Sequence, residues 1–234
     1  MFEPLFADLA GFFEEESKIF LALREAGLRA TNLFDIGSST GGWSCAMSQI
    51  FTGARFFLFE PLVGLKPNYS EGNTRTLKAL PGSRFFQTAL SDRNETQVMF
   101  TDPTGFSSSL LLKSATAGFP DGVPVTVRRL DDLLAEEGLP APDILKMDVQ
   151  GGEMMVLRGL GDRLKEVKVI QTETWFTREY GPDTPLFHEL SESLRAKDFL
   201  LLDIGERFYT SLRELYSCDV FFVRRDILEG LSWR

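Results

Sequence analysis

Three acidic side chains follow short apolar runs of strand length in this chain. Asp35 ends the run NLFD, Glu60 follows RFFLF, and Asp148 follows DILKM. In an open parallel sheet, ligands bind in the crevice outside the carboxyl ends of the strands. We therefore expect Asp35, Glu60 and Asp148 to converge on one crevice.

The first acid leads into a turn rich in glycine and serine, with the sequence GSSTGG over residues 37–42. Glycines allow a sharp turn and a close approach of the ligand, and the helix that follows offers free N–H groups. A dinucleotide fingerprint would need glycine where Ser39 stands. Asp35 also suits a ligand with an amino group better than a pyrophosphate. The turn favours a cofactor such as S-adenosylmethionine.

Glu60 belongs to a Phe59-Glu60-Pro61 motif about 20 residues beyond the glycine turn. An acid at this place can accept hydrogen bonds from both hydroxyls of a ribose. That role fits S-adenosylmethionine and NAD equally well, so this motif leaves both open.

The third motif, KMDVQGGE over residues 146–153, ends a strand and opens a helix. Lys146 needs a carboxylate partner if it points inward. Glu153 is expected to complement the dipole of the helix that it begins.

Several other residues are weaker candidates for chemistry. His188 is the single histidine, and it falls in a helix for which a surface or packing role is expected. Asp143, Asp148 and Glu173 form the one conceivable set of divalent-cation ligands, but no further ligand pattern supports a metal, and none is predicted. Aromatic and serine side chains that either wall or cover an acceptor pocket, or else only pack or face solvent, are Trp175, Phe176, Tyr180 and Ser107, Ser108 and Ser109.

The elements that must position these residues alternate between strands and helices. Strands are predicted over 32–35, 55–59, 84–90, 97–100, 123–127, 143–147, 167–173, 199–204 and 219–223, and helices over 4–26, 43–51, 74–80, 131–137, 153–160 and 186–197. Residues 101–121 read as a long loop of the kind that often forms a functional lid. This order predicts a doubly wound, Rossmann-like α/β sheet that is mostly parallel, with one antiparallel C-terminal strand. The closing pair of consecutive strands suggests that it forms an antiparallel edge element.

Composition limits the classes of partner. The net charge of −9 opposes binding to a phosphate backbone, so no nucleic acid is expected. No apolar run is long enough to span a bilayer, and the N-terminus lacks the features of a signal peptide. The two cysteines, Cys45 and Cys218, have no metal-ligand spacing and suit a reducing compartment. A cytoplasmic protein without a membrane partner is expected.

The ordered motifs resemble the FkbM family of methyltransferases. That family's signature is similar to D-x-G-A-N-x-G, F-E-P, A-L-S-D, V-x-x-L-D-D-L, K-x-D-V-E-G-x-E and a strand that ends in Glu. This chain has matching segments at residues 35–41, 59–61, 89–92, 127–133 and 146–153, and at Glu173. It departs from the pattern at Ser38 and Ser39, which replace Ala-Asn, and at Gln150, which replaces Glu.

The resemblance implies methylation of a hydroxyl on a sugar or natural-product small molecule, with S-adenosylmethionine as the cofactor. It assigns the methionine part of the cofactor to Asp35 and to Gly37, Ser38, Ser39 and Gly41. It assigns the ribose to Glu60 with Pro61, and the adenine to Thr88, Ala89 and Leu90. Asp148 would lie at the reacting end. A sugar hydroxyl is a poor nucleophile, so a general base should help, with Asp148 as the first candidate and Glu173 as the second.

Two other functions stay open at this stage. An NAD(P)-dependent oxidoreductase is disfavoured by the broken glycine fingerprint, and a non-catalytic adenosylmethionine-binding module is left open by Gln150. We expect one domain over residues 1–234, with a helical extension over 1–28 and a catalytic α/β core over 29–234. The extension is expected to cover an edge or to form the contact of a homodimer.

Overall fold

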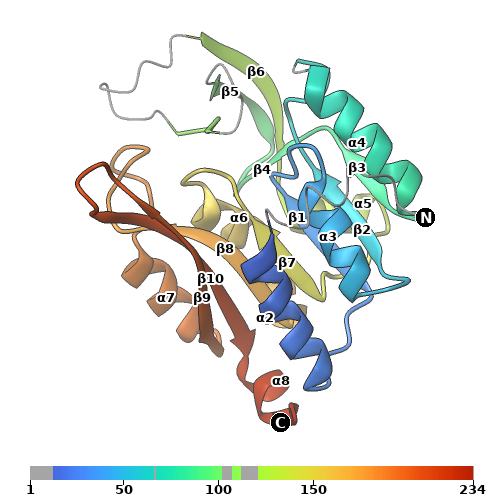
Figure 1. Cartoon of the computed structure of the whole chain (residues 1–234). Helices are drawn as coiled ribbons and strands as arrows, with labels where there is room; N and C mark the ends of the chain where they lie inside the picture. The colour runs from blue at the N-terminus through green and yellow to red at the C-terminus, as the bar shows by residue number, and fades with distance from the viewer. Residues whose placement is uncertain (1–12, 66, 102–106, 112–120, 234) are drawn as a thin grey trace.

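The computed structural model describes residues 13–65, 67–101, 107–111 and 121–233 of the chain. At its centre lies a seven-stranded sheet with the strand order β3-β2-β1-β7-β8-β10-β9. The strands are β1 (Asn32–Ile36), β2 (Arg55–Phe59), β3 (Arg84–Phe86), β7 (Ile144–Met147), β8 (Val169–Trp175), β9 (Phe199–Tyr209) and β10 (Leu215–Arg224). The predicted Rossmann-like α/β fold is confirmed (Figure 1).

The predicted antiparallel C-terminal strand is confirmed as β10, which together with β9 closes one end of the sheet. It pairs antiparallel with both β8 and β9, and β9 takes the edge. The burial of the apolar side chains explains why β10 lies inside the sheet and β9 lies at its edge. Val220, Phe221 and Phe222 of β10 are buried, as an interior strand requires, whereas Leu201 and Ile204 of β9 are 41% and 40% exposed.

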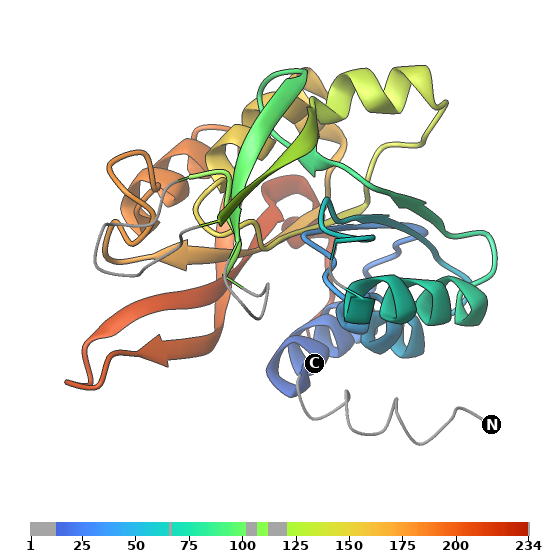
Figure 2. The same cartoon turned by 90° about the horizontal axis from the view of Figure 1, so that it is seen from above.

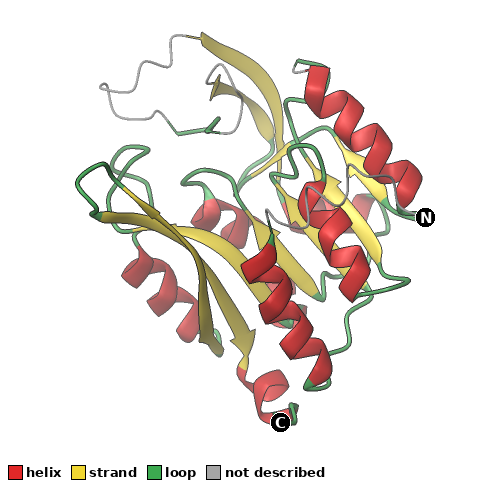
Figure 3. Ribbon diagram, viewed as in Figure 1, coloured by secondary structure: helices red, strands yellow, loops and turns green. Residues whose placement is uncertain are grey.

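Helices cover both faces of the sheet (Figures 2 and 3). One face carries α2 (Glu14–Glu25), α3 (Gly42–Ile50) and α4 (Pro67–Ala79), and the other carries α5 (Leu130–Glu136), α6 (Glu153–Leu160) and α7 (Phe187–Arg195). Strand β2 shows how the sequence serves both layers. Phe56 and Leu58 join the core beneath α2 and α3, while Phe57 and Phe59 join the core beneath α5 to α7. Two further helical segments are a 3₁₀ helix, Gly161–Glu166, which follows α6, and α8 (Arg225–Gly230), which follows β10.

Helix α2 packs against the central sheet as part of one helical layer. Phe20 is fully buried, with ring-centroid distances of 6.0 Å to Trp43, 6.0 Å to Phe51 and 5.5 Å to Phe221. Residues 4–12 of the predicted helix lie outside the described residues. The idea that this segment also forms a dimer contact stays a prediction.

Helix α4 is longer than the predicted 74–80. Its buried side chains are Tyr69, Asn73 and Thr76, followed by Leu80 just beyond its end. These positions are three or four residues apart, which is helical spacing, but the two central side chains, Asn73 and Thr76, are polar. A search for apolar periodicity therefore finds only the C-terminal part of this helix.

A second, three-stranded sheet was not expected. It has the order β4-β6-β5, with β4 (Ala89–Leu90), β5 (Glu95–Thr101) and β6 (Asp121–Arg128). The strand predicted over 84–90 is wrong beyond Phe86, because Phe86 pairs with the last residue of β2 and the central sheet offers no partner farther on. The chain then turns, and Ala89 and Leu90 pair with β6 instead. The segments predicted as strands over 97–100 and 123–127 pair with each other in this sheet.

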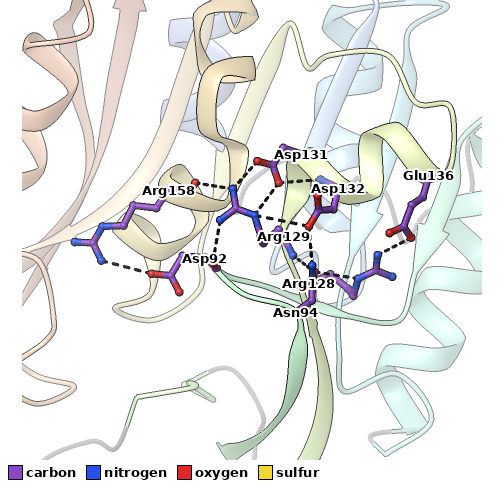
Figure 4. Close-up of polar contacts among 8 residues, drawn as sticks. All are labelled: Asp92, Asn94, Arg128, Arg129, Asp131, Asp132, Glu136 and Arg158. Atoms are coloured by element: carbon purple, nitrogen blue, oxygen red, sulfur yellow. Dashed lines mark hydrogen bonds and ion pairs between the residues drawn. The ribbon is translucent and has the colours of Figure 1, made fainter.

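Charged residues of the ALSD and LDDL segments tie the second sheet to the helices (Figure 4). The guanidinium of Arg129 contacts Asp131 at 2.5 Å and donates to the carbonyl of Asp92 at 2.9 Å. Asn94 accepts the backbone N–H of Arg129 at 2.8 Å and donates to Asp132 at 2.6 Å. These polar residues therefore stabilise the fold.

Replacing Arg129 by Ala should lower the free energy of unfolding by about 1–3 kcal/mol, since a half-buried, charge-assisted set of hydrogen bonds is lost. Arg158 provides the control, because its ion pair with Asp92 is long, at 3.8 Å, and its side chain is 61% exposed. Arg158→Ala should change stability by less than about 0.5 kcal/mol. Urea unfolding measures both values, and equal losses would contradict the assignment.

Within the part of the chain that the structure describes, no helix combines the length and apolar character needed to cross a membrane.

Candidate functional site

A pocket with about 680 Å³ of empty space, including its open mouth, lies at the carboxyl ends of β1, β2 and β7. The second sheet closes it from the side through Leu90 and Met99. Its lining of apolar side chains with a few polar groups is typical of small-molecule and cofactor sites. The predicted site residues that line it are Gly37, Ser39, Glu60, Pro61, Thr88, Ala89, Leu90 and Asp148.

Three predicted cofactor residues, Asp35, Ser38 and Gly41, do not line this pocket. Asp35 is fully buried behind the glycine turn, and the Ser38 hydroxyl lies 3.4 Å from the Asn73 side-chain oxygen. Gly41 has its backbone against Thr76 of α4. The expected convergence of three acids is therefore found for Glu60 and Asp148 but not for Asp35.

Asp35 instead forms a buried ion pair with Lys146, with 3.0 Å between Oδ1 and Nζ. Its other oxygen accepts the Ser44 hydroxyl at 2.7 Å. Lys146 also donates to the carbonyl of Gly37 at 2.8 Å. Burial alone would lower the pKa of Lys146, but the carboxylates of Asp35 and Asp148 raise it, so the ammonium stays charged. The inward Lys146 thus has the carboxylate partner that its burial demands.

The glycine turn needs glycine at two points for steric reasons. Gly37 has a φ of +72°, and a Cβ there would lie 1.9 Å from the backbone oxygen of Asp148. Gly41 has a φ of +80°, and a Cβ there would lie 2.6 Å from the Thr76 hydroxyl. The turn is therefore pressed against both β7 and α4.

Ser39 stands at the centre of this turn and lines the pocket. Its side-chain oxygen is buried and has no hydrogen-bond partner among the described residues. A buried hydroxyl without a partner is costly, so a polar ligand atom in the pocket would relieve it.

Glu60 follows β2 and is 6% exposed. Its carboxylate accepts the backbone N–H groups of Ser39 at 3.0 Å and Leu62 at 2.9 Å. Burial raises the pKa of Glu60 to about 7, although these hydrogen bonds and Lys146 act in the opposite direction. Glu60 therefore changes its charge near neutral pH.

Asp148 begins the loop after β7, and its side chain is 46% exposed. Gln150 lies beside it and donates from Nε2 to Asp148 at 2.8 Å and to Glu173 at 2.9 Å. Glu173 is 8% exposed and does not line the pocket. Burial, followed by the neighbouring acids Asp148, Asp219 and Glu153, raises the pKa of Glu173 well above its ordinary value.

Glu153 holds the loop between Asp148 and α6. It is fully buried and accepts the backbone N–H of Gly151 at 3.1 Å. Burial raises its pKa to about 7. Its position at the start of α6 agrees with the predicted place at the helix dipole.

The weaker candidates divide between the site and the surface. Tyr180 donates to the side-chain oxygen of Gln150, Ser109 donates to the backbone carbonyl of Gln150 at 2.6 Å, and Ser108 lines the pocket. Trp175 is buried against Tyr180, with 5.1 Å between ring centroids, whereas Phe176 is 37% exposed. His188 is exposed on α7.

Asp143, Asp148 and Glu173, the three acids considered as divalent-cation ligands, do not lie together. Asp143 precedes β7 and pairs with Lys168 at 2.7 Å, at the opposite end of the strand from Asp148. Among the described residues, no group of three or more His, Cys, Asp or Glu side chains is arranged to hold a metal ion.

Four pocket residues lie outside the motifs and loop residues singled out from the sequence. They come from the irregular segment after Glu60, from α4, from β5 and from the segment 107–111, and they are Leu62, Tyr69, Met99 and Leu110. The polar helical stripe of α4 was the one available signal, and it points to Tyr69.

The fold and the pocket define a Rossmann-like protein with a ligand site at the carboxyl ends of its strands, and comparison with known proteins gives the family. The profile of the Methyltransferase FkbM domain matches residues 35–201, so the chain belongs to the FkbM methyltransferase family. The predicted resemblance and the predicted methyltransferase class are confirmed, and the oxidoreductase alternative is set aside.

Two relatives are similar over most of the chain. The 2-O-methyltransferase NoeI of Sinorhizobium fredii is 30% identical over 168 residues, which cover 66% of this chain and 67% of that protein. The hexuronic acid methyltransferase AglP of Haloferax volcanii is 28% identical over 209 residues, which cover 88% of this chain and 79% of that protein.

A solved structure supports the fold. The methyltransferase FkbM from Methylobacillus flagellatus superposes with a TM-score of 0.54 at 17% identity. The match covers 85% of this chain but only 46% of that one, so the chain spans less than half of that structure.

The pKa of Glu153 gives a prediction for stability. A carboxyl whose folded pKa is raised binds its proton more tightly in the folded state, so its contribution is present at low pH and is lost as pH rises through about 7. Relative to Glu153→Gln, the wild-type protein should lose up to about 3 kcal/mol of stability between pH 4.5 and 7.5.

Chemical unfolding across this pH range measures the difference. Glu25→Gln, at an exposed position of α2, is the matched control and should run parallel to the wild type. A Glu153→Gln curve that also runs parallel to the wild type would contradict the assignment.

Proposed function

We propose that this protein transfers a methyl group from S-adenosylmethionine to a hydroxyl of a small sugar-like or natural-product acceptor. The observation that carries the proposal is the placement of Glu60, Ser39 and Asp148 on one pocket wall at the carboxyl ends of neighbouring strands. This is where open α/β sheets bind their ligands.

The residues present fit such a cofactor. Glu60 can accept hydrogen bonds from two ribose hydroxyls, and Ser39 has a buried hydroxyl with no partner among the described residues. Ala89, Leu90 and Met99 give the pocket an apolar wall suited to a purine ring. Asp35 would act indirectly here, because its pairing with Lys146 holds the turn that carries Gly37 and Ser39.

S-adenosylmethionine supplies a methyl group on a positively charged sulfur, and the electron pair of the broken C–S bond returns to that sulfur to leave S-adenosylhomocysteine. The chain's own task is to hold the acceptor oxygen in line and to remove its proton. Asp148 is placed for the second task, because its carboxylate is exposed on the pocket wall. The acceptor's proton passes to an Asp148 oxygen as the new O–C bond forms.

Glu173, the second predicted base, is less suited to this task. It is buried outside the pocket wall, and its raised pKa means that it holds a proton to higher pH than an ordinary carboxyl group does. It would serve as a buried neighbour of Asp148, joined to it through Gln150.

The relatives and the polar reacting end support the proposed acceptor class. One relative is named a 2-O-methyltransferase and another a hexuronic acid methyltransferase, which favours a hydroxylated, sugar-like acceptor. A homodimer and a cytoplasmic location stay predictions.

Glu60→Gln should weaken S-adenosylhomocysteine binding roughly 10- to 100-fold, because charge-assisted hydrogen bonds to the ribose are lost. Since ribose hydroxyls bind the ionised carboxylate best, wild-type affinity should also rise as pH increases from 6 to 8 through the pKa of about 7. Calorimetry in buffers of different ionisation enthalpy should show proton release for the wild type and none for the variant. Glu71→Gln, exposed on α4, is the control; unchanged affinity in Glu60→Gln would refute the ribose assignment.

Asp148→Asn should lower turnover by roughly 10²–10⁴-fold, which is the usual worth of a general base. Its affinity for S-adenosylhomocysteine should change by no more than about 3-fold, since only the reacting end is altered. Transfer of labelled methyl groups to a panel of neutral and acidic methyl glycosides measures turnover, with the exposed Asp183→Asn as control.

Equal rates for Asp148→Asn and the wild type would remove Asp148 as the base. Tight cofactor binding without transfer to any hydroxylated acceptor would instead favour the non-catalytic binding module.

A further inference from the structure

Gln150 lies between two carboxyl groups at the reacting end of the pocket. One amide nitrogen, Nε2, donates to Asp148 Oδ1 at 2.8 Å and to Glu173 Oε2 at 2.9 Å. A primary amide has two N–H donors, so both are used. The residue has a φ of +56°, a left-handed conformation that is uncommon for a side chain of this size.

The orientation of this amide is fixed from the other side. The Tyr180 hydroxyl donates to Gln150 Oε1, and the Ser109 hydroxyl donates to the Gln150 backbone carbonyl at 2.6 Å. Burial raises the pKa of Tyr180, so its phenol remains a donor at any ordinary pH. With its oxygen held by a donor, the amide must present its nitrogen to the two acids.

The surroundings are strongly acidic. Asp219 lies opposite Glu173 in the register of β10 and β8, and it hydrogen-bonds to Glu16 of α2. Lys146 is 3.9 Å from Asp148 but is closer to Asp35, at 3.0 Å. The pair of Asp148 and Glu173 is surrounded by other titratable groups. These are Asp35 of β1, Lys146 of β7, Asp219 of β10, Glu16 of α2, Glu153 of α6 and Tyr180 of the loop after β8.

We propose that Gln150 is a positioning residue for methyl transfer, whose amide holds the Asp148 carboxylate in the pocket beside Glu173 by donating to both carboxyl groups without adding a third negative charge. The inference rests on the proposed function for its catalytic meaning. Gln150 itself takes no proton and forms no bond to the acceptor.

Glutamine suits this place better than the glutamate of the FkbM pattern in this particular chain. A glutamate of the same shape would replace two donors by acceptors and bring a third carboxyl group between two others. Like charges at this spacing cannot all ionise, so the cluster would bind an additional proton. Asp148 would then compete for that proton and be less available as a base.

The decisive variant is Gln150→Glu, with Gln49→Glu on the exposed face of α3 as a control that adds the same charge elsewhere. Methyl transfer from S-adenosylmethionine to the best acceptor of the glycoside panel is followed from pH 5 to 9. We expect the acidic limb of the pH–rate profile to move about one unit higher in Gln150→Glu, with kcat at pH 7 reduced about 10-fold. KM for S-adenosylmethionine should stay within about 3-fold of the wild type, and Gln49→Glu should match the wild type throughout.

A second readout does not depend on turnover. The carboxyl ¹³C resonance of Glu173, assigned by its loss in Glu173→Gln, should titrate about one pH unit higher in Gln150→Glu than in the wild type. Tyr180→Phe, which removes the donor that orients the amide, should lower kcat several-fold without moving KM for S-adenosylmethionine.

Superimposable pH profiles and ¹³C titrations for Gln150→Glu and the wild type would overturn the inference. Failure of the wild type to methylate any acceptor would count against the proposed function instead, and the ¹³C titration would still decide whether Gln150 controls the charge of the pair.

Discussion

The buried ion pair between Lys146 and Asp35 is the interaction on which the site depends. It joins the carboxyl ends of β1 and β7, which are neighbours in the central sheet. The same ammonium donates to the carbonyl of Gly37, and so it fixes the start of the glycine turn. An unpaired charge at this depth would be strongly unfavourable, so the two strand ends are held together with the turn between them.

This arrangement accounts for the division of labour among the acids. Asp35 is used within the protein, whereas Glu60 and Asp148 face the pocket from the strands on either side of β1. Burial makes Glu60 sensitive to pH near neutrality, while exposure leaves Asp148 accessible to an acceptor. Gln150 then brings the otherwise repelling carboxyl groups of Asp148 and Glu173 into one hydrogen-bonded unit.

Much of this could be predicted from residue patterns, and the failures have physical causes. The apolar runs that form β1, β2 and β7 are unambiguous because these strands are buried on both faces. The predicted helix was shorter than α4 because the buried side chains of α4 include polar ones. The residues of β4 were assigned to the central sheet because the loss of pairing beyond Phe86 depends on where β2 ends. The role of Asp35 was not predicted because it depends on the ion pair with Lys146, and spacing along the chain does not reveal that the two side chains point toward each other.

The pocket's second wall was beyond prediction for a related reason. Met99, Ser108 and Leu110 reach the pocket from a sheet and a loop whose position is set by tertiary contacts, among them the Arg129 network. The most direct test of the account is an experimental structure with S-adenosylhomocysteine bound. The account predicts the ribose hydroxyls on Glu60 and the sulfur end beside Asp148 and Gln150. A ligand elsewhere on the protein, or one with its ribose away from Glu60, would contradict it.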